Sequence, residues 1–301
     1  MTLTTQAREV IARGRQVLSQ LRELGSAYDS TDESNPLTVF YDDTVSMMDT
    51  AMRTVALLPQ AASGQSYICR GLDVMLTEIY DRLRTLEIGH ERRRRRIQDI
   101  GTLGEILSEL QTNQTIHTVD LERFAERIIE QVELGHPIDF IHESPEYPQA
   151  FAAAHGLTTA QVMARLVKFD PEMRMHSVSA IVASLVHDVG MLSVPPEVLM
   201  TSGSLEGEAR RKVESHTTTG ARWVLPLFRD APWLVEAVAG HHERLDGSGY
   251  PDGAKGDNVK PFTRLLAVCD VYAAMMVPRP HRPARSSRTA LADTLMMADL
   301  K

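Results

Sequence analysis

Histidine and aspartate side chains recur in the second half of the sequence at intervals that could bring them to one metal-binding centre. After the adjacent pair His187-Asp188, further candidate ligands follow at intervals of 29, 25 and 28 residues: His216, the doublet His241-His242, and Asp270. A neutral imidazole supplies a nitrogen ligand, and a carboxylate supplies oxygens that can bridge two cations. An ionised carboxylate buried without a partner is costly, and a metal ion is the usual solution. The spacing therefore indicates a candidate cluster for two metal ions.

The residues around these ligands predict the helices that must position them. Four apolar residues precede the His187-Asp188 pair, which is therefore expected near the end of a buried helix: Ile181, Val182, Leu185 and Val186. The other ligands also lie beside amphipathic stretches, so four helices could present them to one centre. A lone His-Asp dipeptide is weak evidence, but the ordered series is specific.

The stretch HHERLDGSGYPDG completes a pattern that resembles the HD-GYP subgroup of HD-superfamily phosphohydrolases. The resemblance covers about residues 150–290, and Gly249-Tyr250-Pro251 is the tripeptide that names the subgroup. It implies a compact all-α bundle that holds two divalent metal ions, usually iron and sometimes manganese. It also implies hydrolysis of the bacterial messenger cyclic di-GMP to pGpG, and in some members to GMP. The two cations would bind the phosphate and lower the pKa of a bridging water that attacks in line.

The same resemblance implies a set of metal ligands at matching positions. The set has seven members, among which Asp188 would bridge the metals and, with His187, carry catalysis: His155, His187, Asp188, His216, His241, His242 and Asp270. The family has a histidine about 32 positions before the His-Asp pair, which places His155, with Val162, Leu166 and Phe169 expected to face inward on a helix that follows. His176 is the alternative, but a surface or capping role suits its position better.

Substrate-binding residues are implied in two loops. Arg279 and Arg282, in VPRPHRPA, stand where family members place basic residues that hold substrate phosphates, and guanidinium groups suit phosphate oxygens. The alternative is that both are exposed loop arginines. Tyr250 is the third implied substrate-binding residue. Around it, Asp246 and three glycines are expected to shape the loop, with positive φ angles at Gly247, Gly249 and Gly253.

Two positions depart from the family pattern. Met191 stands where the family motif HD-x-G-K has its lysine, which removes a positive charge expected to meet a substrate phosphate. Phe151 stands where three-metal members have a glutamate, which favours a two-metal centre. The loss of the lysine leaves an alternative open, in which the domain is a weak or inactive sensor that binds a cyclic dinucleotide. Hydrolysis of another phosphoester is a third possibility.

The rest of the chain predicts helices without recognisable chemistry. Apolar residues recur at helical spacing in three stretches within about the first 110 residues, the first ending near Gly25. The run Glu91 to Arg96 (ERRRRR) is interpreted as a solvated helix face, with an anionic partner as the alternative. Another helix is expected within residues 118–137. We place a helical region over residues 1–112, for sensing or homodimerisation, before a phosphohydrolase-like domain over residues 113–301.

Composition narrows the classes of protein. The 301 residues carry a formal net charge of −8, which argues against a partner that is a nucleic acid polymer. Two cysteines exclude a disulfide framework. No apolar run is long enough for a membrane span, and the N-terminus shows no signal-peptide core, so a cytoplasmic protein is expected.

Family members generally continue through one or two further helices after the basic loop, so the chain is expected to be shortened or to end early.

Overall fold

The computed structural model describes residues 4–28, 36–58, 64–112, 118–279 and 283–299. Its contacts divide the chain into two compact units, Met1–Gln98 and Asp99–Lys301. The sequence-based boundary near residue 112 lies 14 residues further along, at the end of a helix that the division at Gln98 interrupts. The roles assigned to the two regions stay predictions. Each unit is described by itself.

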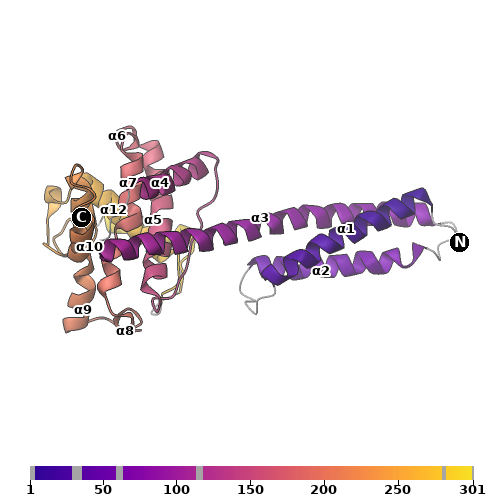
Figure 1. The fold of residues 1–301 in the computed structure, drawn as a ribbon, viewed down its shortest axis with the longest axis horizontal. Coiled ribbons are helices and arrows are strands. Elements are labelled where there is room, and N and C mark those ends of the chain that lie inside the picture. The colour runs from indigo at the N-terminus through magenta and orange to yellow at the C-terminus, as the bar shows by residue number, and fades with distance from the viewer. Residues whose placement is uncertain (1–3, 29–35, 59–63, 113–117, 280–282, 300–301) are drawn as a thin grey trace. The chain divides into compact units, whose positions relative to one another are not determined.

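The first unit is built from helices α1 (Thr5–Tyr28), α2 (Pro36–Val55) and the first part of α3 (Gln65–Gln111) (Figure 1). Its core is almost entirely aliphatic, with fully buried side chains from all three helices: Leu21, Met48, Leu72, Leu76, Ile79, Leu83 and Leu86. The predicted end of α1 at Gly25 is wrong. The helix continues to Tyr28, whose hydroxyl donates a hydrogen bond to the carbonyl oxygen of Leu86 at 2.6 Å.

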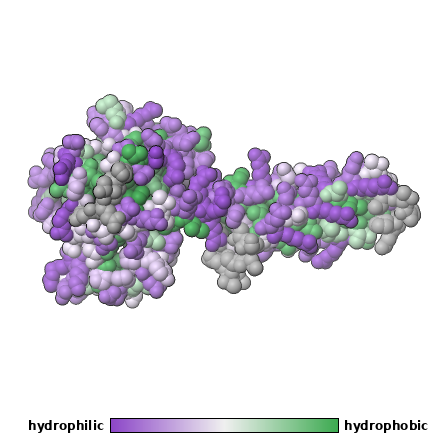
Figure 2. Space-filling model, in the orientation of Figure 1, coloured by the Kyte–Doolittle hydropathy of each residue, from purple (hydrophilic) through white to green (hydrophobic). Residues whose placement is uncertain are grey.

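Helix α3 runs without interruption through the arginine-rich segment. The side chains from Arg92 to Arg95 are exposed, and Arg94 forms an ion pair with Glu91 at 3.1 Å. These features agree with the interpretation of this run as a solvated helix face. On the face of the protein shown in Figure 2, hydrophilic side chains cover most of the surface of each unit, with hydrophobic side chains showing between them.

The second unit is a helical bundle that confirms the predicted all-α fold. After the last part of α3, its helices follow in the order α4 (Thr118–Glu133), α5 (Pro148–Phe169), α6 (Pro171–Arg174), α7 (Ser177–Val186), η2 (Val189–Ser193), α8 (Pro196–Leu199), α9 (Gly207–Glu214), α10 (His216–Val224), α11 (Pro232–Gly240), η3 (Gly256–Asn258), α12 (Pro261–Met275) and α13 (Ser287–Asp299). Helices α5 and α7 pack against each other, α12 packs on α5, and α10 packs on η2 and α11. An isolated β-bridge joins Asp246 and Lys255.

Glycines allow the helices that carry the histidines to approach closely. A Cβ atom added to Gly156 would lie 2.6 Å from the carbonyl oxygen of Leu185, so only glycine lets α5 approach α7 this closely. A Cβ atom on Gly190 would overlap the backbone carbonyl of His216, where η2 meets α10. These contacts place His155, which lies beside Gly156, and His216 near the end of α7.

The orientation predicted for the segment after His155 is only partly right. His155 lies inside α5 rather than before a helix, and Val162 is buried as expected. Leu166 is 40% exposed and Phe169 is 81% exposed, so both point away from the core. The face of α5 that enters the core is rich in alanine, which permits the close contact with α7.

Within the described ranges, no helix combines the length and apolar character that a membrane crossing requires.

Candidate metal centre

All seven predicted metal ligands lie close together in the second unit. They come from five places in the fold: His155 from α5, His187 and Asp188 from the end of α7, His216 from the start of α10, His241 and His242 from the end of α11, and Asp270 from α12. Six of them are at most 6% exposed, and the side chain of His242 is 24% exposed. The helices thus bring residues up to 115 positions apart into one buried cluster.

Three of the histidines are oriented by the same local device. The Nδ1 atoms of His187, His216 and His241 lie 2.8, 2.6 and 2.8 Å from the backbone carbonyl oxygen three residues earlier. A carbonyl oxygen can only accept a hydrogen bond, so each Nδ1 carries the proton and donates it. Each Nε2 is left with a lone pair directed toward the centre, as required of a metal ligand.

Asp188 lies between two groups of histidines. Its Oδ1 atom is 3.2 Å from Nε2 of His216 and 3.5 Å from Nε2 of His241. Its Oδ2 atom is 3.6 Å from Nε2 of His187 and 3.8 Å from Nε2 of His155. The two oxygens of one carboxylate therefore face different groups of imidazoles, which is the arrangement of a bridging ligand.

Asp270 also spans the cluster. Its Oδ1 atom lies 2.7 Å from Nε2 of His155 and 3.9 Å from Nε2 of His187, while its Oδ2 atom lies 3.8 Å from Nδ1 of His242. Two carboxylates and five imidazoles thus surround a common centre.

The donor atoms fit two cations. Two groups each have their donor atoms within 4.8 Å of one another, and they share Asp188: His155 with His187 and Asp188, and Asp188 with His216, His241 and His242. The Nε2 atom of His187 is buried and has no hydrogen-bond partner among the described residues. A buried nitrogen lone pair without a donor is unfavourable unless a cation satisfies it.

The protonation states also suit metal binding. Burial alone would raise the pKa of Asp188, but the imidazoles of His187, His216 and His241 outweigh it and hold that pKa well below its usual value. Burial likewise raises the pKa of Asp270, and its hydrogen bond with His155 reverses the direction, so that this pKa is also lowered. Burial lowers the pKa of His187 and of His242. Both carboxylates are thus ionised, which is the form that coordinates metals, and a bound cation would replace the imidazole protons that lower these pKa values.

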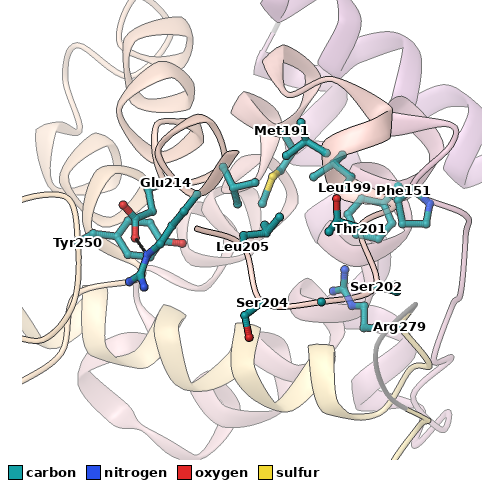
Figure 3. Close-up of a pocket in the computed structure, with 15 residues that line it drawn as sticks. Phe151, Met191, Leu199, Thr201, Ser202, Ser204, Leu205, Glu214, Tyr250 and Arg279 are labelled. Atoms are coloured by element: carbon teal, nitrogen blue, oxygen red, sulfur yellow. Dashed lines mark hydrogen bonds and ion pairs between the residues drawn. The ribbon is translucent and has the colours of Figure 1, made fainter. Parts of the chain in front are cut away.

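A cavity of about 800 Å³ carries two of the three predicted substrate-binding residues, and its size is typical of a small-molecule site. Tyr250 and Arg279 line it at opposite sides, and Met191 lies between them (Figure 3). Arg282 lies outside the described residues. Arg279 is not an exposed loop residue, because its side chain is half-buried. This burial lowers the pKa of its guanidinium, with Asp188 and Asp270 acting in the opposite direction. Its guanidinium carbon lies 4.7 Å from the centre of the Phe151 ring.

The loop that carries Tyr250 is held by a carboxylate that sequence reasoning did not single out. Glu243 is buried, and its Oε1 and Oε2 atoms accept hydrogen bonds from the backbone N–H groups of Asp252 at 2.6 Å and Ala254 at 2.9 Å. Its place directly after the histidine doublet was the available signal. Asp246 shapes the loop as expected, because it accepts a hydrogen bond from the N–H of Ser248 at 2.8 Å.

The expected role of the glycines in this loop needs one correction. Gly247 and Gly253 have positive φ angles of 82° and 63°, as predicted. Gly249 does not have a positive φ. A Cβ atom there would overlap the backbone from His242 to Arg244, so glycine is required for close approach rather than for its dihedral angle.

The fold and the buried cluster together define a class of protein. The HD domain family matches residues 138–301, and this chain belongs to that family. The resemblance to the HD-GYP subgroup, predicted from the motifs, is confirmed.

Individual relatives carry enzymatic names. The chain is 35% identical over 109 residues to a cyclic di-GMP phosphodiesterase of Pseudomonas aeruginosa, an alignment that covers 36% of this chain and 26% of the relative. It is 37% identical over 102 residues to the 3′3′-cGAMP-specific phosphodiesterase 1 of Vibrio cholerae, covering 34% of this chain and 23% of the relative. A cyclic di-GMP phosphodiesterase of Thermotoga maritima is 35% identical over 103 residues, covering 33% and 27%. The matched segments thus span about a quarter of each relative.

Proposed function

We propose that this protein is a metal-dependent phosphodiesterase that hydrolyses a cyclic dinucleotide, with cyclic di-GMP as the leading substrate and pGpG or GMP as the product. The observation that carries the proposal is the division of the Asp188 carboxylate between two groups of histidines, with Oδ1 at 3.2 Å from His216 and Oδ2 at 3.6 Å from His187. A carboxylate bridging two cations is characteristic of centres that hydrolyse phosphate esters. The names of the relatives support the substrate class.

The residues of the chain would divide the work as follows. The five histidines and two aspartates would hold two divalent cations, which supply Lewis acidity for the phosphate and lower the pKa of a water molecule. Arg279, half-buried and stacked on the Phe151 ring, would donate hydrogen bonds to phosphate oxygens at one side of the cavity. Tyr250 would offer a ring and a hydroxyl to the dinucleotide at the other side.

We propose iron as the metal, with manganese as the alternative, because the resemblance to the HD-GYP subgroup implies these ions and the donor set is compatible with both. Imidazole nitrogens suit iron and zinc, and carboxylate oxygens also suit manganese. A mixture of five imidazoles and two carboxylates without a thiolate is compatible with either ion. Metal analysis of protein purified without oxygen tests this assignment: two iron ions per chain are expected, and a thiolate-type metal such as copper(I) would contradict it.

A second candidate function is supported by Met191. Its side chain lines the cavity where a cation could otherwise meet the substrate, and a thioether cannot supply charge. The domain would then bind the dinucleotide, and its signalling role would depend on binding rather than on turnover.

One experiment separates the two candidates. Metal-loaded protein is incubated with cyclic di-GMP, the products are resolved by chromatography, and the dissociation constant is measured in parallel. Formation of pGpG or GMP by the wild type, and none by Asp188→Ala, supports the enzyme. Tight binding without product supports the sensor, and neither binding nor turnover would contradict both.

We also propose that the N-terminal unit forms a homodimer through α3. Tyr67 and Val74, seven residues apart and therefore on one face of the helix, are 77% and 71% exposed. Such apolar side chains gain from burial against a second copy. Light scattering after size-exclusion chromatography should give twice the chain mass for the wild type and a lower mass for Val74→Asp.

A further inference from the structure

The names of the relatives leave the preferred base open. Some are named for cyclic di-GMP and others for 3′3′-cGAMP, which differ by one guanine replaced by adenine. A preference for one base must depend on side chains that form hydrogen bonds with the edge of that base. The cavity wall contains one such pair of side chains, Arg210 and Glu214. The inference below rests on the proposed binding of a cyclic dinucleotide.

Glu214 is unexpected in a cavity for a phosphodiester. Among the described residues that line the cavity, three carry charged side chains: Arg210, Glu214 and Arg279. Glu214 is therefore the one carboxylate in that lining, and it would repel a phosphate. Its favourable partner in a dinucleotide is a hydrogen-bond donor, and the donors of a nucleotide are concentrated on its base.

The carboxylate is held in place beside a cation. Nε of Arg210 donates a hydrogen bond to Oε1 of Glu214 at 2.7 Å, one turn apart on α9. The side chain of Glu214 is 28% exposed and that of Arg210 is 62% exposed, so both can still meet a ligand. A carboxylate accepts about four hydrogen bonds and a guanidinium donates five, so most of their capacity is available to that ligand. Glu214 lies next to Tyr250 at one side of the cavity, across from Phe151 and Arg279 (Figure 3).

We propose that Glu214, held by Arg210, selects guanine over adenine at this side of the cavity. The Watson–Crick edge of guanine carries two adjacent donors, N2–H and N1–H, followed by the acceptor O6. A carboxylate beside a guanidinium presents the complementary order of acceptors followed by a donor. Adenine presents an acceptor at N1, which would face the carboxylate unfavourably. Flipped or unpaired bases are commonly read through this edge.

The test compares three dinucleotides that differ only at this edge: cyclic di-GMP, cyclic di-IMP and cyclic di-AMP. Cyclic di-IMP keeps N1–H and O6 but lacks the 2-amino group. The wild type should prefer them in that order, measured as kcat/KM, or as the dissociation constant if turnover is absent. In Glu214→Gln the ratio of cyclic di-GMP to cyclic di-AMP should fall at least tenfold, and the advantage of cyclic di-GMP over cyclic di-IMP should shrink.

Glu208→Gln is the matched control. Glu208 lies on the same helix and pairs with Lys212 at 3.2 Å, but it does not line the cavity. It should keep the wild-type ratios. An equal loss for all three dinucleotides in Glu214→Gln would overturn the proposal, because it would indicate a disturbance of the nearby His216. A wild type without preference for guanine would overturn it as well.

The outcomes also separate this inference from the proposed function. Binding with a guanine preference that Glu214→Gln abolishes, but without hydrolysis, supports this inference and contradicts only the enzymatic activity. Hydrolysis with base ratios unchanged in Glu214→Gln supports the activity and contradicts only this inference. A protein that binds none of the three dinucleotides contradicts both.

Discussion

The two units bury different kinds of side chain. The core of the first unit consists mainly of aliphatic residues from three helices, with few buried polar groups such as Thr44 and Gln65. The second unit has a larger apolar core, but that core encloses six buried histidines and aspartates. The first arrangement is stabilised by removing apolar surface from water. The second adds a cluster whose charges and lone pairs require a counter-ion.

Because of this difference, stability and function are related differently in the two units. In the first unit, any well-packed set of apolar residues of similar volume would preserve the structure. In the second, the residues that do chemistry are themselves part of the core, so metal binding and folding are coupled. Changes at the cluster should therefore alter activity and stability together, while changes in the core of the first unit should alter stability and leave metal content and hydrolysis unchanged.

The largest effect is expected from Asp188→Ala. Removing the carboxylate that faces both groups of histidines should release at least one metal and lower hydrolysis by more than about a hundredfold. It should also lower the melting temperature of the second unit, because the clustered imidazoles lose their cation. Metal analysis, product formation and calorimetry measure the three effects. Asp120→Ala, which removes an exposed ion pair with Arg123, is the control and should change none of them. Full activity with both metals in Asp188→Ala would show that the carboxylate does not bridge.

A smaller but still large effect is expected from Gly190→Ala. The added methyl group would overlap the carbonyl of His216, so η2 and α10 would have to separate. We expect a loss of about 2–3 kcal/mol of unfolding free energy. Lower metal affinity should accompany it, because His216 is on the helix that moves. Denaturant unfolding with and without metal measures both, and an unchanged midpoint would contradict the close approach.

Met191→Lys should change activity without changing metal content. A cation aimed at a phosphate oxygen acts mainly as negative charge develops in the transition state, so kcat should rise more than binding. A tenfold increase corresponds to about 1.4 kcal/mol. Steady-state kinetics with cyclic di-GMP measures it, and Met191→Leu serves as the uncharged control. An unchanged rate in an active protein would show that the missing charge does not limit hydrolysis.

The smallest effect is expected in the first unit, from Gly71→Ala. Gly71 lies exposed within α3, on the face of Tyr67 and Val74, and an added Cβ atom would meet none of the chain's own atoms within 4 Å. Replacing a glycine inside a helix by alanine should stabilise it by about 0.5–1 kcal/mol. Denaturant unfolding should show this gain, while hydrolysis and metal content stay at wild-type values. A change in hydrolysis would contradict the expectation that the core of the first unit affects stability without affecting the chemistry of the second.

Residue type and order predicted six of the seven candidate ligands, because the side chains that bind metals are few and their intervals match helices that can converge. The seventh, His155, followed only from the family resemblance. Helical periodicity also predicted the all-α fold and the buried end of α7. It failed where neighbours decide orientation: Leu166 and Phe169 have the spacing of an inward face, yet α7 packs on the alanine face of α5.

The remaining features depend on contacts between segments distant in sequence. Nothing local to Asp188 shows that its two oxygens face different groups of histidines, since His155 and His241 reach it from separate helices. The cavity position of Glu214 likewise depends on how α9 lies beside the Tyr250 loop. Sequence by itself determined which atoms could bind metals, because donor chemistry belongs to each side chain. Tertiary structure decided which atoms share a cation and which face a substrate, because these depend on distances that only packing sets.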